Sequence, residues 1–225
     1  MTILIDNVSV RFGDVSVLEG LSLDLRERRI GIIGNNGSGK STLARLLNGL
    51  VLPSAGRVVV EAFDTRTHGA DVRKLVGFVF QNADAQIVMP TVAEDVAFGP
   101  KAHGLAPQDV AARTEKVLAQ FNLAALKDRA CFNLSGGEKQ SLALAGVLAL
   151  DPRWVVFDEP TTMLDRKRAK TAMNAITALP QHVIVVTHHV ELLEGFERVI
   201  VLEAGKVVCD ASPREAIAHY LDTYI

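Results

Sequence analysis

The segment GNNGSGKST, residues 34–42, constrains the fold of this chain more than any other feature. It fits the pattern G-x-x-x-x-G-K-[ST], and it lies between the apolar run RIGIIG and the helix-like run KSTLARLLNGL. In a strand, turn and helix of this kind, the glycines let successive backbone N–H groups point into one concavity, and the helix adds its positive end. The segment therefore predicts a phosphate-binding loop after a buried strand.

Two side chains of this loop suit a nucleotide and its metal ion. The Lys40 ammonium is a compact charge for the β- and γ-phosphates, and the Ser41 hydroxyl is a hard oxygen ligand for Mg²⁺. We expect a nucleotide, with Mg²⁺ as cofactor, to bind at Gly34, Asn35, Asn36, Gly37, Ser38, Gly39, Lys40, Ser41 and Thr42. Kinases, GTPases and motor ATPases share such a loop, so it does not select a function by itself.

The rest of the chain alternates between strand and helix patterns. Residues 3–12 and 17–25 alternate apolar and polar side chains, which predicts antiparallel strands with one solvated face. Mostly apolar runs predict further strands at 29–34, 75–80, 154–159 and 182–189. Because helices separate these strands, and residues 83–150 are mostly helical in pattern, we expect an α/β fold around a mostly parallel sheet.

Composition and charge exclude several classes of protein. The formal net charge of −2 gives no basic excess of the kind that nucleic-acid-binding proteins carry, so we expect no nucleic-acid partner. The two cysteines, Cys131 and Cys209, match no metal-binding spacing. We also expect neither a signal peptide nor a membrane-spanning helix, because no apolar run has the required pattern or length.

Polar side chains follow three of the predicted strands at the point where each leaves the sheet. The carboxyl ends of parallel strands face the ligand crevice, so these side chains are expected to lie near the nucleotide. They are Gln81 after LVGFVF, Asp158 and Glu159 at the end of WVVFDE, and His188 after VIVVT. Each one alone is equally typical of an ordinary turn, and the phosphate loop favours the catalytic interpretation.

The roles expected of these residues follow from their chemistry. Asp158 and Gln81 would join Ser41 around the metal ion, and Gln81 is also suited to holding the water. Glu159 would polarise the attacking water, and a neutral His188 would hydrogen-bond the γ-phosphate. We expect four residues to take part in catalysis: Glu159, His188, Gln81 and Lys40. The adjacent His189 is expected to point elsewhere, since side chains alternate along a strand.

Together these segments resemble the ATP-binding-cassette ATPases. The resemblance assigns GNNGSGKST to the Walker A loop, VVFDE to Walker B, Gln81 to the Q-loop and His188 to the switch histidine. It also assigns LSGGEKQ, residues 134–140, to the family signature and TMLD, with Asp165, to the D-loop. It implies a P-loop NTPase (RecA-like) core with an N-terminal antiparallel β-subdomain and a helical insertion subdomain. Residues 1–225 would form one ATPase domain, with 1–82 and 151–225 as the nucleotide-binding core and 83–150 as the helical signature subdomain.

The same resemblance implies a dimer. In this family two ATPase subunits hold two ATP molecules between them, and the signature of one subunit completes the site of the other. Here the signature residues would be Ser135, Gly136, Gly137 and Glu138, and we expect a homodimer. An ordinary capped helix start explains Ser135, but it does not explain two glycines.

Two positions are less clear within the resemblance. Phe12 falls where the family has an aromatic side chain that stacks on adenine, although a core position is the alternative. The family usually has a Gly-Glu turn before its buried strand, whereas this chain has Glu27 and Arg28, which leaves the geometry of that turn open.

The segment FQNADAQIVMPTVAEDVAFGP, residues 80–100, resembles the ATPases of energy-coupling-factor importers, which take up vitamins and transition-metal ions. There it forms a groove for a helix of a membrane coupling protein. We expect an apolar surface from Ile87, Val88, Met89, Val92, Val96 and Phe98, with Glu94 and Asp95 at its rim. Ordinary core packing of these side chains is the alternative.

The resemblance therefore implies an ATP-hydrolysing subunit that powers an importer of a micronutrient. A compact ATPase with every motif intact resembles most the subunit of a biotin importer, and a cobalt, nickel or other vitamin importer is the alternative. Its partners would be the integral coupling protein and a substrate-binding membrane protein, and it would lie peripherally at the cytoplasmic face of the inner membrane. A non-transport ATPase of the same superfamily, a P-loop kinase or GTPase, and a scaffold that binds ATP without turnover fit the motifs less well.

Overall fold

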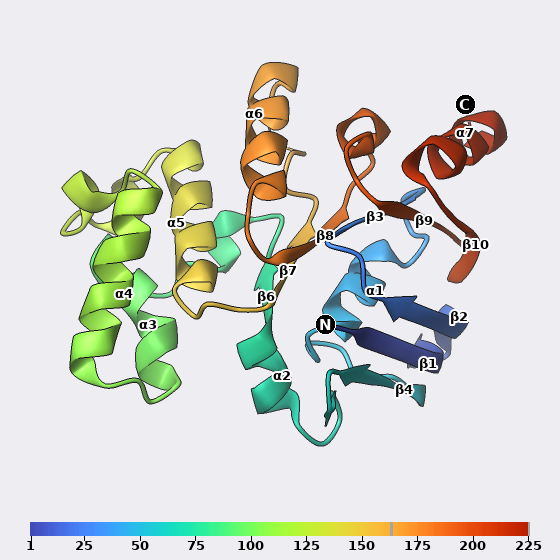
Figure 1. Ribbon diagram of the computed structural model, residues 1–225, viewed down its shortest axis with the longest axis horizontal. Coiled ribbons are helices and arrows are strands. Elements are labelled where there is room, and N and C mark those ends of the chain that lie inside the picture. The colour runs from blue at the N-terminus through green and yellow to red at the C-terminus, as the bar shows by residue number, and fades with distance from the viewer. Residues whose placement is uncertain (163, 225) are drawn as a thin grey trace. The chain divides into compact units, whose positions relative to one another are not determined.

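The computed structural model describes residues 1–162 and 164–224. Met163, in the predicted D-loop, lies outside the described residues. The chain forms two compact units, one from Met1–Gln81 with Arg153–Ile225 and the other from Asn82–Pro152 (Figure 1).

A six-stranded sheet forms the centre of the larger unit. Its strands, in the order β10-β9-β3-β8-β7-β6, are Lys206–Ala211, Arg198–Glu203, Arg29–Gly34, His182–Val186, Trp154–Asp158 and Val76–Val79. All neighbouring pairs are parallel except β10 with β9. The prediction of a mostly parallel sheet is confirmed, and the carboxyl ends of β3, β6, β7 and β8 lie along one edge.

A second, antiparallel sheet of the larger unit has the order β2-β1-β4-β5. Its strands are β1 (Ile3–Phe12), β2 (Val15–Leu25), β4 (Ala55–Val60) and β5 (Phe63–Asp64). In β1, buried Ile3, Ile5, Val8 and Val10 alternate with more exposed residues, as expected of a sheet with one solvated face. These buried side chains share one hydrophobic core with the central sheet and α1.

Helices cover the central sheet of the larger unit. They are α1 (Lys40–Leu46), α2 (Gly69–Leu75), α6 (Arg166–Thr177) and α7 (Pro213–Tyr224), with the short 3-10 turn η4 (Val190–Leu193). Helix α1 lies on the side of the sheet that faces β1 and β2, while α6 and α7 lie on the other side (Figure 1). The sequence patterns did not predict α2, because its seven residues bury a single side chain, Val72.

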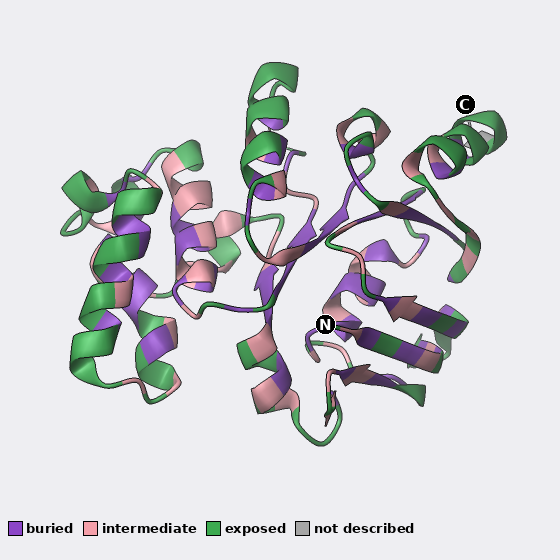
Figure 2. Cartoon of the chain, viewed as in Figure 1, coloured by how far each residue is buried: buried purple, intermediate pink, exposed green. Residues whose placement is uncertain are grey.

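The smaller unit is helical. Its helices are α3 (Val92–Ala102), α4 (Pro107–Gln120) and α5 (Gly136–Leu148), with the 3-10 turns η1 (Ala83–Ala85), η2 (Ala124–Leu126) and η3 (Cys131–Asn133). Buried residues run along all three helices, and the outer face of α4 is exposed (Figure 2). Capping boxes of Thr91 with Glu94 and of Ser135 with Glu138 begin α3 and α5.

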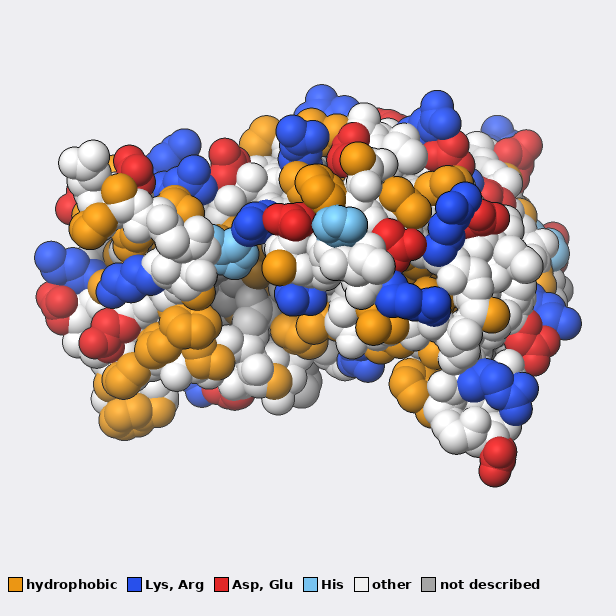
Figure 3. All heavy atoms as spheres, turned by 90° about the horizontal axis from the view of Figure 1, so that it is seen from below, with side chains coloured by type: hydrophobic (Ala, Val, Ile, Leu, Met, Phe, Trp, Pro, Cys, Tyr) orange, Lys and Arg blue, Asp and Glu red, His pale blue; other side chains and the backbone are white. Residues whose placement is uncertain are grey.

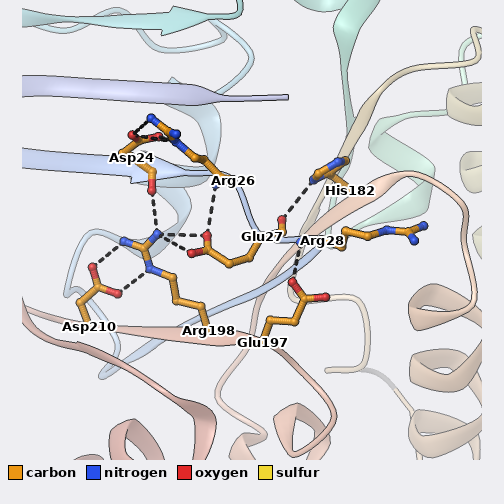
Figure 4. A network of polar contacts seen from close by, with 8 residues as sticks. All are labelled: Asp24, Arg26, Glu27, Arg28, His182, Glu197, Arg198 and Asp210. Carbon is orange, nitrogen blue, oxygen red and sulfur yellow. Dashed lines mark hydrogen bonds and ion pairs between the residues drawn. The ribbon is translucent and has the colours of Figure 1, made fainter.

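A charged network fixes the turn between β2 and β3, whose geometry the sequence left open (Figure 4). Arg198 of β9 donates two hydrogen bonds to Asp210 at 2.6 Å, one to the Asp24 carbonyl at 2.6 Å and two to the Glu27 carboxylate at 3.0 and 3.3 Å. The Arg28 backbone N–H donates to Glu197 at 2.9 Å. These side-chain charges thus hold the turn between β2 and β3 in one geometry.

Candidate functional site

A cavity of about 540 Å³ opens in the larger unit at the carboxyl edge of the central sheet. Its lining comes from the phosphate loop, β2 and the segments that follow β6, β7 and β8. The lining residues are Val17, Asn36, Gly37, Gly39, Lys40, Ser41, Thr42, Gln81, Glu159, Thr162 and His188. Segments far apart in the sequence therefore bring most of the expected ATP-site residues around one space.

Steric contacts explain two of the glycines of the phosphate loop. A Cβ at Gly34 would overlap the carbonyl oxygen of Leu202, and one at Gly39 would overlap the side chain of Leu18. Gly39 also has φ of 100°, in the region that side chains rarely adopt. The loop thus packs tightly on β9 and β2.

Lys40 is folded back onto its own loop. Its Nζ donates to the carbonyl oxygens of Gly34 at 2.7 Å and Asn35 at 2.8 Å. The side chain is largely buried, and this desolvation lowers the pKa of Lys40, although Glu159 and Asp158 oppose the shift. A desolvated ammonium held by two carbonyls is poised to exchange them for phosphate oxygens.

Ser41 and Asp158 form a pair of hard oxygen ligands. The Ser41 hydroxyl donates to Asp158 Oδ1 at 2.8 Å, and Arg45 lies 3.5 Å from Asp158 Oδ2. Burial raises the pKa of Asp158, while the hydrogen bond from Ser41 and the charge of Arg45 oppose this rise. A buried carboxylate next to a hydroxyl fits Mg²⁺. Ser41 and Gln81, with its amide oxygen, are among the described residues that line the cavity, whereas Asp158 is not.

Glu159 and His188 meet at the ends of neighbouring strands. His188 Nδ1 lies 2.9 Å from Glu159 Oε2, and the Thr162 hydroxyl donates to the same oxygen at 3.1 Å. Thr162 has no role in the sequence prediction, although the D-loop motif includes it. The carboxylate is thus held in place on the wall of the cavity.

His189 only partly follows the prediction that it points elsewhere. Its Nδ1 lies 3.6 Å from Glu191 Oε1, so its ion pair is separate from the pair of Glu159 and His188. However, its ring packs on that of His188 with the ring centroids 4.2 Å apart. His189 is thus not among the described residues that line the cavity, as expected, but its ring lies against that of His188 rather than away from it.

Phe12 lies at the end of β1 and is 53% exposed. This exposure excludes the alternative that Phe12 is a core residue. It is not among the described residues that line the cavity, whereas Val17 of β2 is. Val17 had no signal in the sequence beyond its place in an alternating strand.

The signature residues lie at the start of α5 in the helical unit. Ser135 accepts a hydrogen bond from the Glu138 N–H at 3.4 Å, and Glu138 accepts one from the Ser135 N–H at 2.7 Å. A Cβ added at Gly136 or Gly137 would meet no described atom within 4 Å. Packing within this chain therefore does not explain the two glycines.

Asp165, the predicted D-loop aspartate, caps α6. Its side chain accepts a hydrogen bond from the Arg168 N–H at 2.9 Å. This contact accounts for the helix start, and the assignment of Asp165 to the D-loop remains a prediction.

The helical unit has a cavity of its own, of about 390 Å³, which we call the helical-unit groove. It is lined by Asp84, Ile87, Val88, Met89, Pro90, Cys131, Phe132 and Lys139. Val88 is 61% exposed and Phe132 79% exposed. Hydrophobic side chains also gather on the surface at the left of Figure 3, where the helical unit lies.

The structure corrects the predicted composition of this apolar surface. Val92 and Val96 belong to the core of the helical unit and are fully buried, so they offer no surface. Asp95 is also buried rather than at the rim, and its carboxylate accepts hydrogen bonds from the N–H groups of Val88 and Met89. Phe132, which the sequence did not single out, contributes instead.

Within the described part of the chain, no helix combines the length and the apolar character that crossing a bilayer requires.

The sequence pattern of the ABC transporter family matches residues 18–162. Among curated proteins, one of Deinococcus radiodurans, named only for an ABC transporter ATP-binding role, is 53% identical over 95% of each chain. The biotin transport ATP-binding protein BioM of Rhizobium etli is 46% identical over 98% of each chain. The energy-coupling factor transporter ATP-binding protein EcfA1 of Caldanaerobacter subterraneus is 44% identical over 88% of this chain and 74% of its own.

Among solved structures, CbiO1 of Clostridium perfringens, part of the ABC transporter complex CbiONQ, superposes with a TM-score of 0.85. It is 28% identical and covers 97% of this chain and 92% of its own. The predicted P-loop NTPase fold is confirmed by this match.

Proposed function

The chain belongs to the ABC transporter family, as the ATPase subunit of an importer of the energy-coupling-factor type, and we propose that this importer carries biotin. The observation that carries the proposal is the 46% identity to the biotin transport protein BioM, which extends over nearly the whole of both chains.

We assign hydrolysis to the cavity of the larger unit. The backbone N–H groups of residues 34–42 and the Lys40 ammonium bind the phosphates. Glu159 orients the attacking water and accepts its proton, while His188 donates a hydrogen bond towards the γ-phosphate. A Mg²⁺ ion held by Ser41, Gln81 and Asp158 would neutralise phosphate charge there.

We also propose that two copies of this chain bind ATP between them. The backbone N–H groups and the Ser135 hydroxyl at the start of α5 would face the γ-phosphate of the ATP bound to the partner subunit. The open space at Gly136 and Gly137 supports this arrangement, because these positions have no steric reason to be glycine in the single chain. Loss of the γ-phosphate would then remove the bridge and open the dimer.

The helical-unit groove is the proposed contact with the integral coupling protein, at the cytoplasmic face of the inner membrane. Exposed Val88 and Phe132 and the adaptable Met89 suit an apolar helix lying in a groove. Val88→Asp or Phe132→Asp should sharply reduce the membrane protein recovered with the tagged chain. Leu52→Asp is the matched control, since Leu52 is 47% exposed in the larger unit. Equal recovery from all three variants would contradict the assignment.

Uptake measurements test the substrate. In cells that lack this chain, the wild-type protein should restore uptake of radiolabelled biotin, and Lys40→Ala should not. The second candidate, a cobalt, nickel or other vitamin importer, is favoured by the 44% identity to EcfA1, whose name as an energy-coupling factor protein specifies no substrate. Restored uptake of Co²⁺ or Ni²⁺ without biotin uptake would replace the first proposal with the second.

A further inference from the structure

The C-terminal helix α7 reaches the phosphate loop through the side chain of Tyr220. Ala216 and Tyr220 are four residues apart on one face of α7, and both are buried in the larger unit. The Tyr220 hydroxyl donates a hydrogen bond to Asn35 Oδ1 at 3.1 Å. The last helix of the chain thus reaches the second residue of the loop.

Asn35 holds several parts of this loop together. Its backbone carbonyl accepts hydrogen bonds from Lys40 Nζ at 2.8 Å and from the Ser38 N–H at 3.1 Å. The same residue therefore positions the lysine, closes the turn at the start of the loop and is itself held through its side chain by Tyr220.

A second C-terminal contact holds the loop through backbone groups. In the turn between β9 and β10, the Gly205 N–H donates to the Ser38 carbonyl at 3.1 Å, and the Gly205 carbonyl accepts from the Glu19 N–H at 3.0 Å. This contact survives any change at Tyr220. The contribution of α7 can therefore be measured separately from that of the β9–β10 turn.

We propose that Tyr220 is a positioning residue for the phosphate loop, and that it raises the affinity of this chain for ATP by holding the Asn35 side chain. With Asn35 fixed, the loop is ordered before the nucleotide arrives. ATP binding therefore does not include the loss of conformational entropy that ordering the loop would cost. The inference rests on the proposed role of residues 34–42. The Tyr220 hydroxyl bonds the Asn35 side chain, whereas Lys40 is held by the backbone carbonyls of Gly34 and Asn35, so we expect the turnover of bound ATP to be unchanged.

Tyr220→Phe tests the proposal, because it keeps the ring and deletes the hydroxyl. Loss of the hydrogen bond to Asn35 predicts an increase of about three- to ten-fold in Kd and KM for ATP, with kcat unchanged. Titration of the purified full chain with ATP gives Kd, and phosphate release gives KM and kcat. His219→Ala, an exposed neighbour on α7, is the control and should match the wild type. A lower Tm with unchanged Kd and KM would mean that Tyr220 is merely structural, and would overturn the proposal.

A double-mutant cycle tests whether Tyr220 acts through Asn35. In the Asn35→Ala background, Tyr220→Phe should change Kd no further, because the acceptor is already gone. Additive effects would refute the inference. Lys40→Ala distinguishes a failure of the proposed nucleotide site from a failure of the positioning role. If Lys40→Ala weakens ATP binding while Tyr220→Phe does not, only the positioning role of Tyr220 fails. If Lys40→Ala binds ATP as the wild type does, the nucleotide site itself is wrong.

Discussion

Glu159 and His188 form a contact of 2.9 Å between Oε2 and Nδ1 at the ends of two parallel neighbours, β7 and β8. Glu159 has φ of 54°, a left-handed conformation that is uncommon for a residue with a side chain. Such costly backbone conformations concentrate at functional sites, where the surrounding structure imposes them. Here the Glu159 N–H donates to the Val186 carbonyl at 2.9 Å, which ties the carboxylate residue to β8.

Glu159→Gln should reduce ATP hydrolysis by about 100-fold or more, because the amide cannot accept the proton of the attacking water. The side chain keeps its size and can still hydrogen-bond Thr162, so ATP binding should persist. Phosphate release measures turnover, and light scattering after size exclusion should show a dimer that accumulates with ATP. Turnover within a few-fold of the wild type would remove Glu159 from the role of general base.

Lys40→Ala should lose most of its affinity for ATP, by roughly 10- to 100-fold, because charge-assisted hydrogen bonds to the phosphates are lost. The measurement is the increase in Tm on adding ATP, which depends on the ratio of ligand concentration to Kd. At a concentration about 100 times the wild-type Kd, the wild type gains about 2.7 kcal/mol, and the variant should gain much less. Lys206→Ala, an exposed lysine that pairs with Glu19, should respond as the wild type does.

The residues along the carboxyl edge of the central sheet could be placed from the sequence because their positions follow local patterns. The phosphate loop needs glycines at fixed offsets, and Gln81, Asp158 and His188 each follow an apolar run that ends at the same edge of the sheet. Short elements without such a pattern were missed, as α2 shows with Val72 as its one buried side chain. The hydrogen bond between Tyr220 and Asn35 joins residues 185 positions apart, and no local sequence pattern predicts it.

The helical-unit groove shows how a sequence resemblance can mislead about single side chains. Val92 and Val96 are four residues apart, so once Thr91 caps α3 they must lie on one helical face. That face packs against α4 and α5, and both valines enter the core. Phe132 lines the groove from η3, a different segment. The side chains that make up this apolar surface can therefore be identified only from the folded chain.

Gly136→Ala and Gly137→Ala should weaken dimerisation with ATP by about ten-fold or more, because a methyl group would crowd the approaching partner subunit. The single chain should not suffer, since both positions face open space and alanine is the better helix former. The effect is best measured in the Glu159→Gln background, where ATP is not consumed, by light scattering as a function of protein concentration.

Gly146→Ala provides the matched control for this experiment. Gly146 lies in the same helix α5, and a Cβ there also meets no described atom within 4 Å. It should raise helix stability without affecting the dimer. If all three variants dimerise equally, the two glycines of the signature have no role in subunit contact, and the arrangement in trans loses its support.

Arg198→Met should lower the free energy of unfolding by about 2 kcal/mol, because it leaves the half-buried Glu27 and Asp210 without their shared cation. Burial opposes ionisation of Glu27, but its backbone hydrogen bonds and Arg198 lower the pKa of this carboxyl overall. A carboxyl with a lowered pKa stabilises the fold above its unfolded value, about 4.3, and this stabilisation is lost as pH falls through the folded value. The Met variant should therefore lose less stability than the wild type when denaturant unfolding is repeated at pH 7 and pH 4.

Arg26→Met, which removes an exposed partner of Asp24, is the control. It should measurably change neither the free energy of unfolding nor its difference between pH 7 and pH 4. If Arg198→Met unfolds at the wild-type denaturant midpoint, the network does not hold the turn between β2 and β3.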